Sequence, residues 1–384
     1  MKKNTKKSIK KILLSIYLIT VLLFTGVGST FAGTANPSTF HPYAFLANSP
    51  EYYAKFGILP NIILPYEDGL RTSSVSGDYE WWYFEAALSD GSMMVIVFYD
   101  KNPQSPNVSG FQPFVTFDQI EPNGTTISGQ APYSANDFSA SKLYCNVKMG
   151  PNTFVGDLHN YTIHVDLPAT EVVNGVSSVV NVTANIALQG TIRPWRPDTG
   201  YIVFKDYTTE HYFAWLPAVP QGNVTCTLNI SGKTQTLTGI GYHDHNWGDY
   251  AISSLMDHWY WGRAMVGSYS AITSDITASQ YYNSSAIPIF MLANNGKIIA
   301  DEGSKVTFTP SDIQTENGIP VANIVTYDYN NGEYQVIYSN PTVIAAEPFD
   351  SGVYLRFLGA ATLMNGTTVV GPSPASWELM WLGS

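Results

Sequence analysis

The apolar residues of this chain fall in short runs rich in Val, Ile, Thr and aromatic residues, and helical periodicity is almost absent. Such runs are typical of β-strands. The clearest are Met93–Tyr99, Tyr161–Leu167, Val179–Leu188, Tyr201–Lys205, Ser268–Ala278, Val321–Tyr327, Glu333–Tyr338 and Val353–Leu358. Asp-Gly or Asn-Gly pairs, which readily form hairpin turns, begin at Asp90, Asn123, Asn295, Asn331 and Asn365. The pattern predicts an all-β protein built as a sandwich or a barrel.

The segment before residue 66 departs from this pattern. Ser49-Pro50-Glu51 looks like a helix N-cap with proline at the first helical position, and it predicts a short helix over Ser49–Phe56. The rest of this segment is expected to be an irregular arm over residues 33–65. The chain is long enough for two domains with a core each. We expect these domains at residues 66–249 and 250–384.

The first 32 residues have the pattern of a secretory signal peptide. Six lysines among the first eleven residues precede an apolar run from Ile12 to about Val27, and Thr30-Phe31-Ala32 supplies the small residues of a cleavage site. An uncleaved membrane anchor is the alternative, because the run is near the lower length for a span. We therefore expect a secreted or cell-surface protein that contacts a membrane only through this segment, if at all.

The composition restricts the partners. The formal net charge is −11, with only 13% charged residues but 14% aromatic ones. An acidic surface disfavours nucleic acid and anionic lipid headgroups as partners. The two cysteines, Cys145 and Cys226, could form one disulfide in an oxidising compartment or could each be a small buried residue. The sequence leaves both possibilities open.

The most informative stretch is Gly239-Ile-Gly-Tyr-His-Asp-His-Asn-Trp-Gly-Asp-Tyr250. Three of the seven histidines lie between His243 and His258, beside tryptophans and acidic residues. Proton donors and acceptors next to apolar rings are typical of a buried reactive site. An extended backbone would place His243, His245 and Trp247 on one face and Asp244 and Asn246 on the other. In a purely structural interpretation, the histidines bond to strand ends and the tryptophans fill a core.

Two other segments also separate by face. In Gly77–Glu85, the side chains of Glu80, Trp82 and Phe84 share one face, whereas those of Trp81, Tyr83 and Glu85 share the other. A buried carboxylate is unfavourable unless it is functional or paired, so Glu80 and Glu85 either act in a site or bind backbone amides or an arginine.

The second segment, Ser268–Ala278, carries an acidic residue among apolar and hydroxyl side chains. Tyr269, Ala271, Thr273 and Asp275 share one strand face. Burial raises the pKa of a carboxyl group, so Asp275 could stay protonated and act as an acid.

No cofactor is expected, because the chain has no Walker loop, no GxSxG elbow and no GxGxxG motif that follows a strand. The Gly239-x-Gly241 pair opens no helix and predicts close backbone packing instead. The His243-x-His245 pair resembles a metal pair that His258, Asp244 or Asp249 could complete. That spacing alone is a weak signal, so no metal is expected.

Four motifs in this order resemble the carotenoid 1,2-hydratase (hydroxyneurosporene synthase) and kievitone hydratase superfamily, which also includes decalin-forming pericyclases. They are Glu80-Trp-Trp-Tyr83, Tyr212-Phe-Ala-Trp-Leu-Pro217, Gly239-x-Gly-Tyr-His-Asp-His-Asn-Trp-Gly248 and Trp259-x-Trp-Gly-Arg263. The resemblance covers roughly residues 66–384. It implies two tandem lipocalin-like β-barrel or β-sandwich domains with a hydrophobic ligand cavity at or between them.

The resemblance also implies site residues. His245 and Trp247 match the functional pair of the family, and Asp275 is the best match for its acid. The tyrosine two positions before that acid is Thr273 here. The further catalytic candidates are Asp244 and His243. The substrate-binding candidates are Trp82, Trp247, Trp259, Trp261 and Arg263.

The leading hypothesis is an exported hydro-lyase that adds water to an isoprenoid or related alkene. Asp275 would donate the proton, His245 would act as base, and Trp247, Trp259 and Trp261 would face the cation. The alternatives are a lipocalin-like lipid- or terpenoid-binding protein without catalysis, and a pericyclase or isomerase that uses the same cavity. A metal-dependent hydrolase is the last candidate.

Overall fold

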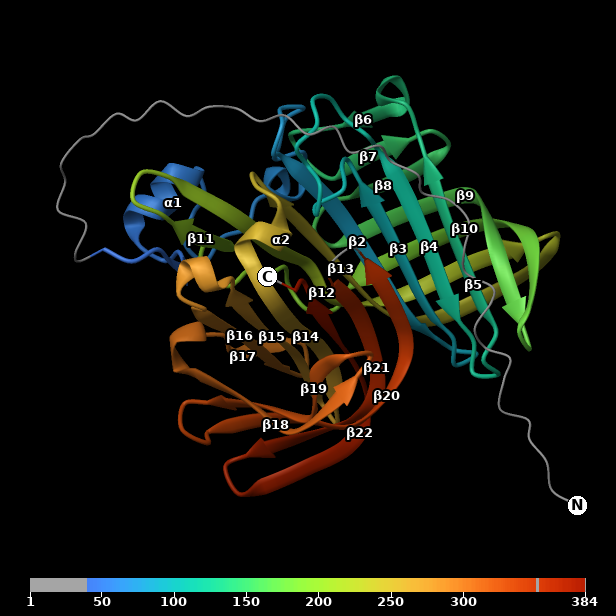
Figure 1. Ribbon diagram of the computed structural model, residues 1–384. Coiled ribbons are helices and arrows are strands. Elements are labelled where there is room, and N and C mark those ends of the chain that lie inside the picture. Colours follow the sequence, from blue (N-terminus) through green and yellow to red (C-terminus); the bar gives the residue numbers. More distant parts are fainter. Residues whose placement is uncertain (1–39, 350–351, 384) are drawn as a thin grey trace, which may run out of the picture. The chain divides into compact units, whose positions relative to one another are not determined.

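The strands predicted from the sequence form two large sheets (Figure 1). The computed structural model describes residues 40–349 and 352–383, and residues His41–Ser384 form one compact unit. Strands predominate throughout the described residues, which confirms the all-β prediction. The glycines of the five predicted hairpin pairs all have positive φ angles, as tight turns require.

The first sheet contains thirteen strands. They are β1 (Tyr43–Leu46), β2 (Tyr79–Leu88), β3 (Met93–Tyr99), β4 (Phe114–Ile120), β5 (Thr126–Pro132), β6 (Phe138–Ala140), β7 (Asn146–Met149), β8 (Asn152–Gly156), β9 (Asn160–Val173), β10 (Val176–Gly190), β11 (Tyr201–Lys205), β12 (Glu210–Ile230) and β13 (Lys233–Gly248). Antiparallel pairing runs from β12 through β13, β2, β3, β4, β5, β9 and β10 and returns to β12, so these strands form a closed ring.

The second sheet contains nine strands, coloured from gold to red in Figure 1. They are β14 (Met256–Val266), β15 (Tyr269–Ala278), β16 (Ala286–Asn294), β17 (Lys297–Ala300), β18 (Val306–Glu316), β19 (Ile319–Tyr329), β20 (Tyr334–Phe349), β21 (Gly352–Asn365) and β22 (Thr368–Trp381). The last strand, β22, pairs with β14, so the end of the chain lies next to the WxWGR segment.

Helices are few and short among the described residues. They are the α-helices α1 (Pro50–Phe56) and α2 (Ile252–Leu255) and the 3-10 helices η1 (Pro65–Asp68), η2 (Ala135–Asp137), η3 (Gln280–Tyr282) and η4 (Gly303–Lys305). The predicted helix is confirmed as α1, with Ser49 as N-cap. The arm is less irregular than expected, because Tyr43–Leu46 forms strand β1 and pairs with β11. The sequence did not predict this strand, because four residues are too few to show the alternation of apolar and polar side chains.

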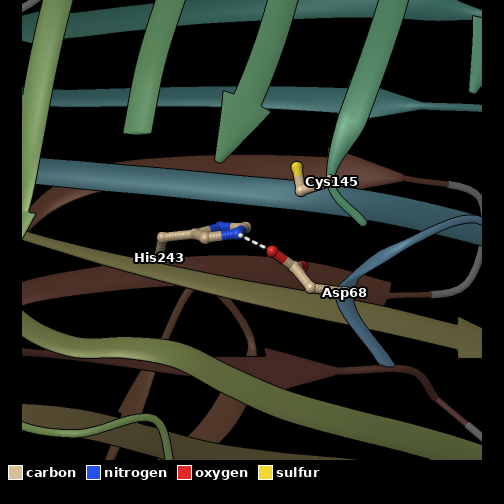
Figure 2. Close-up of side chains that lie close together, drawn as sticks. All are labelled: Asp68, Cys145 and His243. Atoms are coloured by element: carbon tan, nitrogen blue, oxygen red, sulfur yellow. Dashed lines mark hydrogen bonds and ion pairs between the residues drawn. The ribbon is translucent and has the colours of Figure 1, made fainter. Parts of the chain in front are cut away.

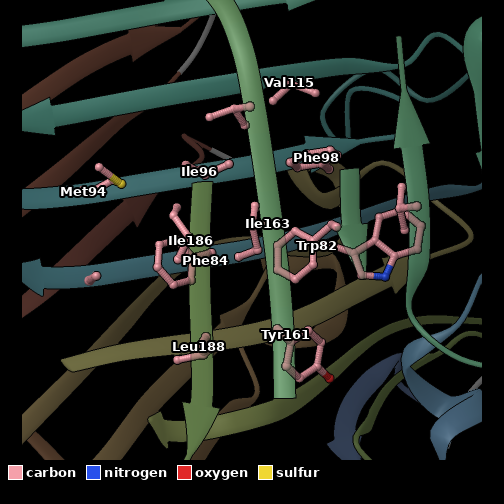
Figure 3. Close-up of a cluster of buried hydrophobic side chains, with 14 of the residues drawn as sticks. Trp82, Phe84, Met94, Ile96, Phe98, Val115, Tyr161, Ile163, Ile186 and Leu188 are labelled. Carbon is pink, nitrogen blue, oxygen red and sulfur yellow. The ribbon is translucent and has the colours of Figure 1, made fainter. Parts of the chain in front are cut away.

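The interior of the first sheet is a large apolar core. Trp82 and Phe84 of β2 pack there with residues of β3, β9 and β10 (Figure 3). Both cysteines are buried in this core and are free, so the disulfide is absent. Gly239 and Gly241 allow close strand packing, because a Cβ atom at Gly239 would lie 2.3 Å from the Ala87 carbonyl oxygen. The predicted role of this glycine pair is confirmed.

A separate apolar cluster joins the two sheets. It combines outward-facing residues of the first sheet, such as Phe213 and Trp215 of β12, with Trp261 of β14 and Ile276 of β15. A third cluster fills the concave side of the second sheet. The chain passes from one sheet to the other between Gly248 and Met256, while the division into domains at residue 249 stays a prediction.

The predicted signal peptide lies outside the described residues. Within them, no helix is both long enough and apolar enough to span a lipid bilayer.

Candidate functional site

Strand β13 carries the histidine motif and has a different environment on each face. It lies between β12 and β2, and its register pairs His245 with Trp82 and Asn246 with Trp81. The histidines lie on the interior side, while Asp244 and Asn246 line a cavity on the opposite side. The predicted separation of this motif into two faces is therefore confirmed.

The cavity on the outer face of β13 lies between the two sheets, has a volume of about 480 Å³ that includes open solvent, and has mainly aromatic walls. Its lining residues are Trp81, Tyr83, Phe213, Trp215, Asp244, Asn246, Trp259, Trp261, Ser274, Ile276 and Glu378. A larger pocket of about 1650 Å³, which includes open solvent, shares Trp81, Tyr83, Trp259 and Glu378 with it. The aromatic cavity thus adjoins a wider pocket that is open to solvent.

Asp244 is the only carboxyl group that β13 contributes to this cavity. Its Oδ2 accepts hydrogen bonds from Trp215 Nε1 and from the Tyr242 hydroxyl group, both at 2.7 Å. Its Oδ1 accepts a hydrogen bond from Asn246 Nδ2, also at 2.7 Å. Burial raises the pKa of Asp244 to about 6, although these three donors favour the ionised form. Asp244 can therefore hold a proton near neutral pH and release it.

Glu378 of β22 brings a second carboxyl group to the cavity. Its Oε1 accepts a hydrogen bond from Trp259 Nε1 at 3.2 Å, and its Oε2 accepts one from the Tyr354 hydroxyl group at 2.8 Å. Arg356 Nη2 lies 3.0 Å from the same Oε2. Burial raises the pKa of Glu378, although Arg356 opposes the shift. Two carboxyl groups from different sheets thus line one cavity.

Arg356 also joins the two sheets through Glu85 of β2. Arg356 Nη1 lies 2.7 Å from Glu85 Oε2, and Arg263 Nε lies 2.6 Å from Glu85 Oε1. Burial alone would raise the pKa of Glu85, but the two arginines outweigh burial and lower it to about 2. Of the two roles expected for Glu85, the structure shows the arginine-paired one.

Glu80 is also a paired carboxylate, and its partners include backbone amides. Its carboxylate accepts hydrogen bonds from the amide groups of Arg71 and Thr72 and lies 2.7 Å from His245 Nε2. The other nitrogen of His245, Nδ1, lies 3.3 Å from the Glu67 carbonyl oxygen. His245 is fully buried on the interior side and stacks against Trp82. It therefore does not reach the aromatic cavity.

Asp275 lies on the opposite face of β15 from the cavity. Its neighbours on the strand, Ser274 and Ile276, line the cavity, whereas Asp275 pairs across the ladder with Tyr260. Its Oδ2 accepts a hydrogen bond from Thr277 Oγ1 at 3.1 Å, and its Oδ1 has no hydrogen-bond partner among the described residues. Burial raises the pKa of Asp275 to about 6, as expected. The structure does not bring Asp275 together with His245 or with Trp261.

The tryptophans also divide between the two environments. Trp259 and Trp261 line the cavity, whereas Arg263 is not among its lining residues and pairs with Glu85 instead. Trp82 and Trp247 lie in the interior, where Trp82 Nε1 donates a hydrogen bond to the Asp68 carbonyl group at 3.2 Å. Other lining residues were not predicted from the sequence as binding residues, namely Trp81, Tyr83, Phe213, Trp215 and Glu378. The alternation of side chains along β2 placed Trp81 and Tyr83 on one face and Trp82 on the other. It did not indicate which of these faces lines a cavity.

The sequence profile of the Diels-Alderase-like family matches residues 71–328. This range covers most of the chain and all of the cavity residues except Glu378. The chain belongs to the Diels-Alderase-like family. The resemblance to the hydratase and pericyclase superfamily, inferred above from four motifs, is thereby confirmed.

Named relatives support the same family. The quinolone epoxide rearrangement protein of Penicillium thymicola is 29% identical over 238 residues, which cover 58% of this chain and 61% of that protein. The hydroxyneurosporene dehydrogenase of Chlorobaculum tepidum is 26% identical over 220 residues, which cover 49% of this chain and 53% of that protein. The chain therefore aligns with less than two thirds of the length of either relative.

A solved structure shares the fold. A protein assigned as AttH from Nitrosomonas europaea superposes with a TM-score of 0.55 at 15% identity, covering 83% of this chain and 96% of that protein. Similarity at this level shows a common all-β, lipocalin-like architecture. The related families are catalytic.

Proposed function

We propose that the protein is an acid-catalysed isomerase that rearranges or cyclises a hydrophobic alkene or epoxide in the aromatic cavity. The observation that carries the proposal is Asp244, a buried carboxyl group with a pKa of about 6 on the wall of this cavity. Near neutral pH, a fraction of the molecules carry the proton on an acid with this pKa. The same pKa is low enough for the acid to transfer its proton readily to the substrate. The rearrangement activity in the name of the Penicillium relative supports the same class.

In the proposed reaction, Asp244 gives its proton to an epoxide oxygen or to an alkene carbon. In the epoxide, a lone pair of the oxygen takes the proton and the C–O bond then breaks with its electron pair moving to the oxygen, which leaves an alcohol and a carbocation centre. In the alkene, the π bond supplies the electron pair of the new C–H bond, and the carbocation develops at the other carbon. The faces of Trp81, Trp259 and Trp261 can stabilise that charge, because aromatic rings present a negative face to cations. Bond migration or ring closure moves the cation, and loss of a C–H proton to the Asp244 carboxylate ends the cycle. The product then has the mass of the substrate.

The second candidate is hydration, the leading hypothesis from the sequence. Glu378 favours it, since a second carboxyl group on the same cavity could take a proton from a water molecule that attacks the cation. Glu378 and Asp244 would then replace His245 and Asp275 in the roles of base and acid. The product would be heavier by one water.

The experiment uses the purified protein with acyclic isoprenoid alkenes and matched aromatic or terpenoid epoxides in heavy-oxygen water. An isomer of unchanged mass supports the isomerase, and a product that carries one labelled oxygen supports the hydratase. Retention of ligand without any product would favour a binding protein and would refute both. Asp244→Asn should abolish turnover in either reaction, whereas Asp275→Asn, a buried acid with the same pKa outside the cavity, is the matched control. If only Asp275→Asn loses turnover, Asp244 is not the acid.

A further inference from the structure

Three side chains of types that bind metal ions lie close together inside the first sheet, away from the aromatic cavity. They are Asp68 at the end of η1, Cys145 between β6 and β7, and His243 of β13 (Figure 2). One ligand atom of each lies within 4.8 Å of the others, and all three residues are fully buried. The sequence indicates His243 and His245 as a possible metal-binding pair, and it connects neither histidine with Asp68 or Cys145.

The hydrogen bonding of His243 leaves one nitrogen directed at Asp68. His243 Nδ1 donates to the Tyr83 carbonyl oxygen at 2.8 Å, which fixes the ring, and Nε2 lies 3.2 Å from Asp68 Oδ2. Metal-binding histidines are typically held in this way by a hydrogen bond from the other ring nitrogen. With the proton on Nδ1, Nε2 and the carboxylate are both acceptors. Either a second proton or a metal ion must lie between them.

Other features of the cluster also favour a metal ion at this position. Asp68 is 1% exposed, and its Oδ1 accepts no hydrogen bond of normal length among the described residues, since His245 Nδ1 lies 3.6 Å from it. A buried acceptor that is satisfied so weakly is unfavourable. The other oxygen, Oδ2, already accepts a hydrogen bond from the Tyr161 hydroxyl group. The Cys145 thiol lies 3.6 Å from the Phe154 carbonyl oxygen, to which it donates a long hydrogen bond, and it also interacts with the Asp68 carboxyl group. A cation could bind the Asp68 carboxylate and the thiolate together.

We propose that Asp68, Cys145 and His243 bind a zinc ion. Thiolate, imidazole and carboxylate together are ligands that zinc prefers, and the charges of one thiolate and one carboxylate balance those of Zn²⁺. Tetrahedral zinc separates its ligand atoms by roughly 3.3–3.8 Å. The ligand atoms here lie within 4.8 Å of one another, so the three side chains need to close by about 1.5 Å at most. The Tyr161 hydroxyl group or a water is available as the fourth ligand. Binding releases the thiol proton of Cys145 and involves no redox change.

The role of this ion would be structural. It would connect η1, the β6–β7 loop and β13, which are far apart in the sequence. The first two segments are already in close contact, since Leu70 N donates to the Ser141 carbonyl oxygen at 2.7 Å and a Cβ at Gly69 would lie 2.8 Å from the same oxygen. The site is independent of the proposed function, because none of its three ligands lines the aromatic cavity.

The test compares two buried free cysteines. Metal-free full chain is dialysed against Zn²⁺, and bound zinc is measured by elemental mass spectrometry for the wild type, Cys145→Ser and Cys226→Ser. We expect one zinc per chain for the wild type and for Cys226→Ser, and an affinity lower by at least about tenfold for Cys145→Ser. At free zinc a hundred times its dissociation constant, the ratio of folded to unfolded wild type should rise about a hundredfold. Equal zinc affinity of the two variants would overturn the proposal.

A spectroscopic measurement on the wild type keeps the test decisive if Cys145→Ser fails to fold. Co²⁺ in the site should produce a thiolate-to-cobalt charge-transfer band in the near ultraviolet and visible bands typical of tetrahedral coordination. Both should also be present in Cys226→Ser. Cobalt binding without a thiolate band would exclude Cys145 as a ligand, and failure of the wild type to retain stoichiometric zinc or cobalt would exclude the site altogether.

Discussion

Replacing Asp244 by asparagine should lower activity and, at neutral pH, raise stability. Asparagine has nearly the same shape and can still accept the hydrogen bonds of Trp215 and Tyr242, but it carries no acidic proton. We expect turnover to fall by about a hundredfold to ten-thousandfold, which is the usual contribution of a general acid. In the wild type, turnover should fall about tenfold per pH unit above pH 6, because the pKa of Asp244 is about 6.

The stability effect follows from the same pKa. An exposed aspartate has a pKa of about 3.9, so the folded protein holds the Asp244 proton over a range of about 2 pH units in which the unfolded chain has lost it. The wild type therefore loses stability as the pH rises from about 4 to about 6, by up to about 3 kcal/mol, and the loss remains at higher pH. The asparagine side chain of the variant does not ionise. The stability of the variant relative to the wild type should thus rise by about 2 kcal/mol between pH 4.5 and pH 7.5.

The assay is urea unfolding of both proteins at pH 4.5 and pH 7.5. Other buried acids, including Asp118 and Glu378, also make stability depend on pH, but they are present in both proteins and cancel in the difference. Asp275→Asn should show a similar stability change with turnover retained, because the pKa of Asp275 is also about 6. If the stability difference between Asp244→Asn and wild type is the same at both pH values, the raised pKa of Asp244 is refuted.

Two further predictions concern groups around the cavity. Arg356→Met should lower the free energy of unfolding by about 3–5 kcal/mol in urea, because Glu85 loses a buried partner; a loss below about 1 kcal/mol would show that Arg263 alone can compensate for it. Trp215→Phe keeps an aromatic wall but removes the indole donor to Asp244, so the pKa of Asp244 should rise and the pH–rate profile should move to higher pH. An unchanged or more acidic profile would contradict this account.

The sequence predicted the strands well because their side chains alternate with a period of two. That period also separated Trp81 from Trp82 and Asp244 from His245 correctly. It could not show which face of β13 meets the second sheet, since this depends on contacts between residues far apart in the chain. Asp275 illustrates the limit, because it and the cavity-lining Ser274 are adjacent in sequence but lie on opposite faces.

Residues without a local pattern were not found from the sequence. Glu378 reaches the cavity, and Arg356 reaches the adjoining larger pocket, only because β22 pairs with β14 and β21 pairs with β22. Asp68 lies in a short 3-10 helix, and Cys145 lies in a loop, so no periodicity indicated that they would meet His243. Pairing of this kind becomes visible only when the strand order of the sheet is known.

Strand β13 is one wall shared by two compartments, and this limits how the protein can change. Its odd-numbered residues from His243 to Trp247 belong to the interior, while the even-numbered Asp244 and Asn246 belong to the cavity. Substitutions at the even positions can alter chemistry while the packing of the interior is left intact. Insertion or deletion of one residue would exchange the two sets, because each side chain would move to the other face. New reactions on this scaffold are therefore accessible through point substitutions in β13, whereas changes in its length would destroy the fold and the site together.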